Sequence, residues 1–170
     1  MTAAAIIGGS GLTALKNLKI TRREVMRTPY GEPSAPLVYG ELAGREVVFL
    51  PRHGAGHTIP PHGVNYRANI WALKQTGAAR VIAVNAVGGI TSGYLSSERL
   101  VLPDQIIDYT YDREHTFFGN DLQQVTHIDF TEPYCVELRR LLIEAAKLAK
   151  LPHVDHGTYG ATQGPRFESA

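Results

Sequence analysis

The sequence has little that points to the cell exterior, to a membrane or to a polyanion. Among its 170 residues there is one cysteine, Cys135, which excludes an internal disulfide and fits a reducing compartment. No apolar run approaches the length of a membrane span, and Met1–Ala5 lacks the basic and apolar regions of a signal peptide. We therefore expect a cytoplasmic protein that does not act at a membrane.

The sequence also lacks a large excess of charge of either sign. The 17 basic and 16 acidic side chains leave a formal charge of +1, whereas a general nucleic-acid binder would carry a basic excess. We therefore expect no nucleic-acid partner. The hydrophobic fraction of 44% is that of an ordinary globular protein, and the length predicts a single domain over residues 1–170.

The central feature of the sequence is residues 80–90, which combine a β-branched apolar run with small residues. Val81–Val84 predicts a short strand buried on both faces, in the manner of a parallel sheet. Asn85, Ala86 and Gly88–Gly89 follow it. In open α/β sheets, ligands bind just outside such carboxyl ends. The alternative is a core strand that leaves through a glycine turn.

A glycine-rich turn follows another predicted strand, Ala4–Ile7. Residues 8–12 place Ser10 among three glycines, a composition that can offer backbone N–H groups and a hydroxyl to an anion. Gly9, Gly11 and Ala14 also satisfy the dinucleotide fingerprint G-x-G-x-x-A. That interpretation is weaker, because the basic region 19–24 shows no clean strand ending in an acid.

A predicted hairpin, residues 37–42 and 45–50, ends in another chemically active pair, Arg52 and His53. His57 and His62 follow among glycines and prolines, which make a helix improbable, and no acidic residue or cysteine lies nearby to complete a metal site. We therefore predict histidines that bind an anion or substrate, and no metal.

The remaining periodicities predict further α/β elements. Residues 65–74 predict a helix that Gly77 terminates, and a second helix opens at Thr131-Glu132-Pro133, with Arg139 on its solvated face. Residues 109–129 predict a long loop. Strands are expected at 100–102, 105–108 and 156–162, and the last of these should lead into a helix that would extend past Ala170.

Five blocks of the sequence carry a resemblance to a known family: Ile6–Leu12 (IIGGSGL), Arg52–Gly54 (RHG), His57–Ile59 (HTI), Val64–Leu73 (VNYRANIWAL) and Gly164–Phe167 (GPRF). In this order they resemble the trimeric purine nucleoside phosphorylases, and within them the 5'-methylthioadenosine phosphorylase branch. The resemblance runs from the first strand to the last residue and implies an α/β domain with a mixed twisted central sheet flanked by helices. Family members are longer, which implies that a C-terminal part is missing here.

The resemblance implies phosphorolysis of a purine nucleoside, with 5'-methylthioinosine as the nearest match for the substrate. Phosphate would be a co-substrate, no cofactor is expected, and the enzyme would be a homotrimer. The alternatives are a 5'-methylthioadenosine phosphorylase, a general 6-oxopurine nucleoside phosphorylase, a dinucleotide-binding Rossmann protein, or a chain that keeps the fold without catalysis.

The resemblance also assigns roles to individual residues. Asn85 departs from the threonine expected in the methylthioadenosine branch, and the group that contacts the purine nitrogen is expected beyond Ala170. Glu168, directly after Phe167, matches the 6-oxopurine phosphorylases; its alternative role is to cap a following helix. The implied phosphate ligands are Ser10, Arg52, His53, Asn85 and Ala86; Phe167 would pack on the purine, Glu168 would bind it, and His127 would reach the 5' substituent from a neighbouring subunit.

Overall fold

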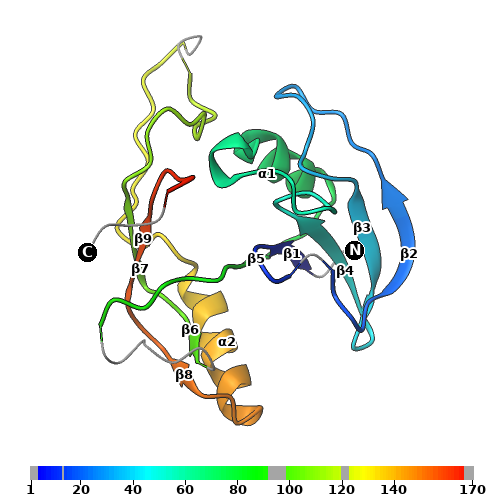
Figure 1. Ribbon diagram of the computed structural model, residues 1–170, viewed down its shortest axis with the longest axis vertical. Helices are drawn as coiled ribbons and strands as arrows, with labels where there is room; N and C mark the ends of the chain where they lie inside the picture. Colours follow the sequence, from blue (N-terminus) through cyan, green and yellow to red (C-terminus); the bar gives the residue numbers. More distant parts are fainter. Residues whose placement is uncertain (1–3, 13, 92–98, 120–122, 167–170) are drawn as a thin grey trace. The chain divides into compact units, whose positions relative to one another are not determined.

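The computed structural model of the chain describes residues 4–12, 14–91, 99–119 and 123–166 (Figure 1). Contacts divide it into two compact units. Unit 1 contains the described parts of residues 1–86, 112–119 and 164–166, and unit 2 those of 87–111 and 120–163. That residues 1–170 form a single domain stays a prediction.

Unit 1 is built on a five-stranded mixed sheet in the order β2-β3-β4-β1-β5. β1 is parallel to both β4 and β5, whereas β3 is antiparallel to β2 and β4. The predicted hairpin is confirmed as β3–β4; Ala43 and Gly44 have φ of 48° and 75°, the geometry of a tight hairpin turn. The strands are β1 (Ala4–Gly8), β2 (Lys19–Glu24), β3 (Leu37–Leu42), β4 (Arg45–Pro51) and β5 (Val81–Val84).

Helix α1 (Tyr66–Gln75) packs on this sheet, after a short 3-10 turn at Pro61–Gly63. It begins where predicted because the Asn65 side chain accepts a hydrogen bond from Ala68 N at 3.0 Å, and it ends before Gly77, whose φ is +74°. Alternate strand residues face the helix. The core they form with it contains Ala5, Ile7, Leu37, Tyr39, Val48, Leu50, Ala72 and Leu73.

Strand β2 is not predicted by the sequence. Its residues, Lys19–Glu24, are almost all exposed and mostly polar, so they lack an apolar alternation. Pairing with β3 and the Arg22 guanidinium, 3.5 Å from the centre of the Tyr39 ring, stabilise it. Although β2 ends in an acid, it is antiparallel to β3 and not beside β1, and the described residues between β1 and β2 contain no helix. This topology disfavours the dinucleotide-binding interpretation.

The prediction that β5 is buried on both faces is wrong. β5 lies at the edge of the sheet with β1 as its neighbour, and Val81 and Val84 are 41% and 39% exposed. Apolar composition predicted a strand correctly, but burial depends on neighbours that composition does not specify.

Unit 2 contains two parallel strand pairs and one helix. β6 (Leu100–Val101) pairs with β8 (His153–Val154), and β7 (Gln105–Asp108) pairs with β9 (Thr158–Ala161). α2 spans Val136–Leu148, so its predicted start at residues 131–133 is wrong. Cys135 keeps an extended backbone, with ψ of 112°, and the helix begins only after it. Neither described helix is long and apolar enough to cross a membrane.

Arg139 does not belong to a solvated face of α2, as predicted. Its Nε donates to Pro103 O at 2.7 Å, and its Nη2 donates to Leu102 O at 3.2 Å and Asp155 O at 2.6 Å. One guanidinium thus joins the helix to the backbone after β6 and after β8.

The predicted long loop is confirmed in its described residues, 109–119 and 123–129, which contain neither helix nor strand. The part that belongs to unit 1 is fixed to α1. Arg67 forms an ion pair with Glu114 at 2.5 Å and lies 5.1 Å from the centre of the Tyr30 ring, which contacts Phe117 edge to face. Arg67 therefore connects three segments of unit 1.

Candidate functional site

Three neighbouring parallel strands of unit 1 end at the same level. In the sheet register, Gly8 of β1 lies opposite Pro51 of β4 and Val84 of β5. The next residue on each strand is Gly9, Arg52 and Asn85, respectively. Because carboxyl ends of parallel strands meet at one edge of a sheet, these three residues are brought together.

Gly9 provides the space on which the site depends. A Cβ on this residue would lie 2.5 Å from Val84 O, 2.9 Å from Arg52 Nη2 and 3.2 Å from Asn85 Oδ1. Any side chain would therefore collide with the backbone oxygen of Val84 and crowd the two polar side chains. The Arg52 guanidinium lies across this glycine to reach Asn85.

Arg52 is held by two neutral acceptors. Its Nη1 donates to Asn85 Oδ1, and its Nη2 donates to His53 Nε2 at 3.1 Å. Within the described part of the chain, Arg52 pairs with no carboxylate. An amide and an imidazole orient a guanidinium without cancelling its charge, so the site keeps one positive charge.

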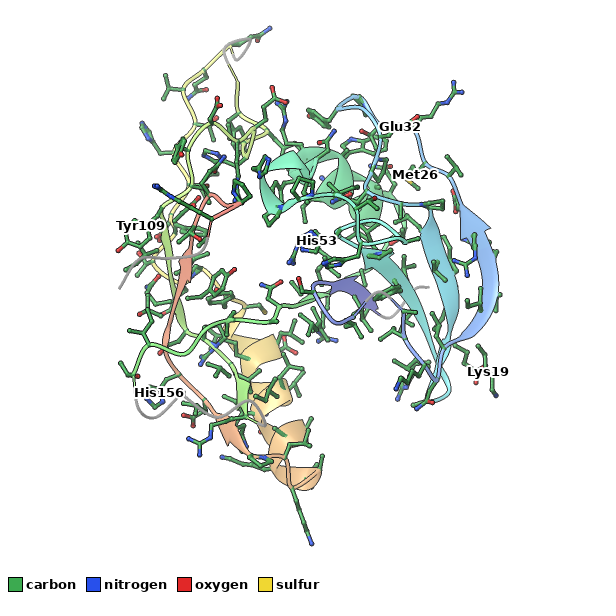
Figure 2. All side chains as sticks on the ribbon, viewed as in Figure 1. Lys19, Met26, Glu32, His53, Tyr109 and His156 are labelled. Atoms are coloured by element: carbon green, nitrogen blue, oxygen red, sulfur yellow. The ribbon has the colours of Figure 1, made fainter. Side chains whose placement is uncertain are left out.

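His53 is fixed in one tautomer by its partners. It is only 5% exposed and lies just beyond β4 (Figure 2). Its Nδ1 lies 2.7 Å from Ile59 O, which can only accept, so Nδ1 carries the proton and Nε2 accepts from Arg52. Burial lowers the pKa of His53, as do the nearby Arg52 and His57, whereas the bond to Ile59 opposes them. The imidazole is therefore neutral.

A tight turn after β4 positions this ring. Gly54, with φ of +78°, donates its N–H to Pro51 O at 3.0 Å, and Ile59 N–H donates to His53 O at 3.1 Å. His57 also adopts a left-handed backbone, with φ of 54°, and its ring centre lies 4.8 Å from that of His53. His57 is exposed, which keeps it available to solutes.

Two more of the predicted phosphate ligands lie at the same strand ends. Ser10 is exposed in the turn after β1, which the bond from Leu12 N–H to Gly9 O closes at 3.0 Å. Ala86 is exposed and follows Asn85. Ser10, Arg52, His53, Asn85 and Ala86 thus belong to one edge of one sheet, although their role as phosphate ligands stays a prediction.

Three predicted site residues remain, His127, Phe167 and Glu168. His127 is exposed in unit 2, in a segment without helix or strand. Phe167 and Glu168 lie outside the described residues. Sequence reasoning missed two features of the site: that only a glycine fits at position 9, and that the carbonyl of Ile59 accepts a hydrogen bond from His53. The glycine pair Gly8–Gly9, directly after a buried strand, was the signal available for the first feature.

This arrangement is suited to a small oxyanion. A guanidinium has five N–H donors, of which the two described bonds use two. Planar N–H pairs recognise oxyanions well, and a glycine turn with a hydroxyl lies on the adjacent strand end. The described residues contain no group of three or more histidine, cysteine or acidic side chains that could hold a metal ion.

Residues 3–170 match the Phosphorylase superfamily. The chain is 53% identical over 169 residues to a probable S-methyl-5'-thioinosine phosphorylase from Pseudomonas syringae pv. tomato, covering 99% of this chain and 68% of the relative. It is 49% identical to an S-methyl-5'-thioadenosine phosphorylase from Pyrococcus furiosus, covering 99% and 64%. The chain therefore spans about two thirds of the length of these relatives.

The fold has a close match among solved structures. A methylthioadenosine phosphorylase from Schistosoma mansoni in complex with adenine superposes with a TM-score of 0.93 at 36% identity, covering 99% of this chain and 68% of that structure. The predicted fold class, a mixed sheet with flanking helices of the nucleoside phosphorylase type, is confirmed.

Proposed function

Since the chain belongs to the Phosphorylase superfamily, we propose that its protein catalyses phosphorolysis of a purine nucleoside, with 5'-methylthioinosine as substrate. The observation that carries the proposal is the environment of Arg52. This residue pairs with neutral groups only and keeps its positive charge, at the edge of the sheet where β4, β1 and β5 end side by side. The products would be hypoxanthine and 5-methylthioribose 1-phosphate.

The reaction is a displacement at the anomeric carbon. A phosphate oxygen forms the new bond to this carbon, the glycosidic bond breaks, and its electron pair leaves with the purine, which gains a proton. The transition state resembles an oxocarbenium ion, so an anion fixed next to it supplies both the nucleophile and charge stabilisation. No electrons are transferred, so we propose a reaction without a cofactor, in which phosphate is the second substrate.

In this proposal Arg52 supplies the charge that holds phosphate, and Ser10, Asn85 and Ala86 line the same edge. Neutral His53 adds no charge of its own, which leaves Arg52 as the main attraction for the anion. Phosphate placed there would lie outside the carboxyl ends of the parallel strands, where α/β sheets bind ligands.

The choice of base is proposed from Glu168 and from the similarity to a probable thioinosine phosphorylase. A 6-oxopurine presents a ring N–H that an ionised carboxylate accepts, whereas a 6-aminopurine presents a bare nitrogen there. We place Phe167 on the purine face and His127 of a neighbouring subunit at the 5' substituent. We also propose that the protein is a homotrimer located in the cytoplasm. Measurement of its mass in solution would test the first point, and fractionation of cells the second.

The direct test is release of free purine by the full-length protein, with and without phosphate. We expect phosphate-dependent cleavage of 5'-methylthioinosine, with lower efficiency on inosine because an apolar pocket leaves a 5'-hydroxyl unpaired. Equal efficiencies would favour a general 6-oxopurine nucleoside phosphorylase. Preference for 5'-methylthioadenosine would favour that branch, which one of the similar relatives represents.

Two other outcomes would overturn the proposed reaction. Thermal stabilisation by NAD(P), with no effect of phosphate, would favour a dinucleotide-binding protein. No turnover and no stabilisation by phosphate or nucleoside would indicate a chain that keeps the fold without catalysis.

A further inference from the structure

We propose that residues 113–117 form a salt-sensitive strap, which is a segment that side chains hold on α1 and that opens without unfolding of the protein. When closed, the strap supports the segment Gly164–Arg166. Residues 112–119 belong to unit 1, although the residues directly before them, 87–111, belong to unit 2. The chain thus returns to unit 1 for this short stretch. The link from the strap to purine binding rests on the proposed function.

The first step concerns what holds the strap. The Arg67 guanidinium, on the first turn of α1, pairs with Glu114 at 2.5 Å and lies 5.1 Å from the centre of the Tyr30 ring. The Phe117 ring contacts the same tyrosine edge to face, with the ring centres 5.1 Å apart. The Asn65 side-chain amide donates to Tyr30 O at 2.7 Å, which fixes this tyrosine to the start of α1. Two residues of the strap therefore meet one arginine–tyrosine pair.

The second step concerns the strength of these contacts. The Glu114 side chain is 81% exposed, and exposed ion pairs are weak and are screened by salt. A cation–π contact and one aromatic pair add modest amounts. Residues 113–117 form neither helix nor strand, so no sheet pairing adds to these side-chain contacts. The strap is therefore held closed but opens far more often than the paired strands of the sheet separate.

The third step concerns what the strap supports. Arg113 Nη1 donates to the Tyr66 hydroxyl at 3.1 Å, and that hydroxyl donates to Pro61 O at 2.7 Å. A Cβ on Gly164 would lie 3.8 Å from two ring atoms of Pro61, so Gly164 lies against the same proline. The segment Gly164–Arg166 leads directly into the residues proposed to bind the purine. One hydroxyl thus links the strap, through a proline, to the approach to the purine site.

Limited proteolysis of the full-length protein tests the opening. Chymotrypsin cleaves after Phe117 and Phe118 when the strap is released, so the initial rate, read by mass spectrometry, follows the open population. We expect Glu114→Gln to raise this rate about threefold, and Glu114→Lys, which places a second cation beside Arg67, about tenfold. Salt at about 0.5 M should raise the wild-type rate about threefold and the Glu114→Gln rate less than about 1.5-fold. Equal rates in the three proteins would overturn the strap.

Glu144→Lys is the matched control for these variants. Glu144 is also an exposed carboxylate, paired on α2 with Arg140 at 2.7 Å. We expect its replacement to change cleavage after Phe117 and Phe118 less than about 1.5-fold. A rise equal to that in Glu114→Lys would show that any lost surface pair exposes the segment, and would overturn local opening. Because Glu114 is exposed, its variants remove no buried group and should fold.

A second arm tests the link to the purine site. Tyr66→Phe removes the hydroxyl that joins Arg113 to Pro61. We expect the KM for 5'-methylthioinosine to rise about fivefold, while the KM for phosphate stays within about twofold of the wild type. By linkage, nucleoside without phosphate should slow cleavage of the strap in the wild type more than in Tyr66→Phe. An unchanged KM for nucleoside would overturn the link.

The two proposals fail in different ways. Absence of phosphorolysis by the wild type would overturn the proposed function, and with it the link from the strap to purine binding. Phosphorolysis by the wild type, combined with equal cleavage of the Glu114 variants or with an unaffected Tyr66→Phe variant, would overturn this inference alone.

Discussion

Gly9→Ala is the substitution that tests the site geometry most directly. The added Cβ would lie 2.5 Å from Val84 O, a backbone atom in a paired strand, where ordinary contacts exceed about 3.4 Å. Either β1 or β5 must shift by several tenths of an ångström. Overpacking of this kind costs roughly 1–3 kcal/mol in the free energy of unfolding.

The same Cβ would separate the two partners that hold the anion site. It would lie 2.9 Å from Arg52 Nη2 and 3.2 Å from Asn85 Oδ1, so the guanidinium would have to shift from its place across the strand end. Loss of an oriented, charged hydrogen-bond donor is worth about 1.5–3 kcal/mol, which corresponds to a roughly tenfold or greater loss of phosphate affinity. The substitution should therefore raise the KM for phosphate as well as lower stability.

The assay combines chemical denaturation with phosphate titration of the full-length protein. Gly160→Ala is the matched control, because a Cβ at Gly160 meets no atom within 4 Å and its φ is not positive. We expect that control to change stability by less than about 0.5 kcal/mol. Phosphate affinity within twofold of the wild type in Gly9→Ala would refute the geometry.

Four further predictions concern single side chains. Arg52→Lys keeps the charge but loses the planar N–H pair, so the KM for phosphate should rise roughly tenfold; an unchanged KM would place the anion elsewhere. Arg139→Met should lower the free energy of unfolding by about 2–3 kcal/mol, whereas Arg140→Met, which removes an exposed pair with Glu144, should cost less than about 0.5 kcal/mol. Because folding lowers the pKa of His53, the unfolded chain binds the proton more readily than the folded protein does. His53 therefore contributes stability above pH about 6.5 that is lost on acidification. His53→Gln should flatten this part of the plot of unfolding free energy against pH. Glu168→Gln should narrow the preference for 5'-methylthioinosine over 5'-methylthioadenosine, which we expect to be on the order of 100-fold, and an unaltered ratio would assign Glu168 to helix capping.

Local patterns predicted the elements that carry their own signals. The apolar runs of β1 and β4, the hairpin turn and the helix that Gly77 terminates all depend on residues close together in the sequence, and the structure confirms them. The same patterns placed Arg52 and Asn85 after strands. Parallel pairing of those strands then brings them together.

Features that depend on distant partners could not be predicted in this way. β2 is polar and forms because β3 and the Tyr39 ring lie beside it. The carbonyl partners of Arg139 come from residues 102, 103 and 155, which no sequence spacing connects to α2. The exposure of β5 depends on its edge position rather than on its apolar residues.

The partners of each arginine decide what its charge can do. Arg67 and Arg140 pair with Glu114 and Glu144, so their charges are largely satisfied within the chain. Arg52 is oriented by an amide and a neutral imidazole, which fix its position and leave its charge to attract a solute. The burial that keeps His53 neutral therefore serves the anion site, because a protonated imidazole would lose the acceptor that holds Arg52. The neutral partners of Arg52, rather than the number of basic residues near it, are therefore what indicates an anion site at this strand end.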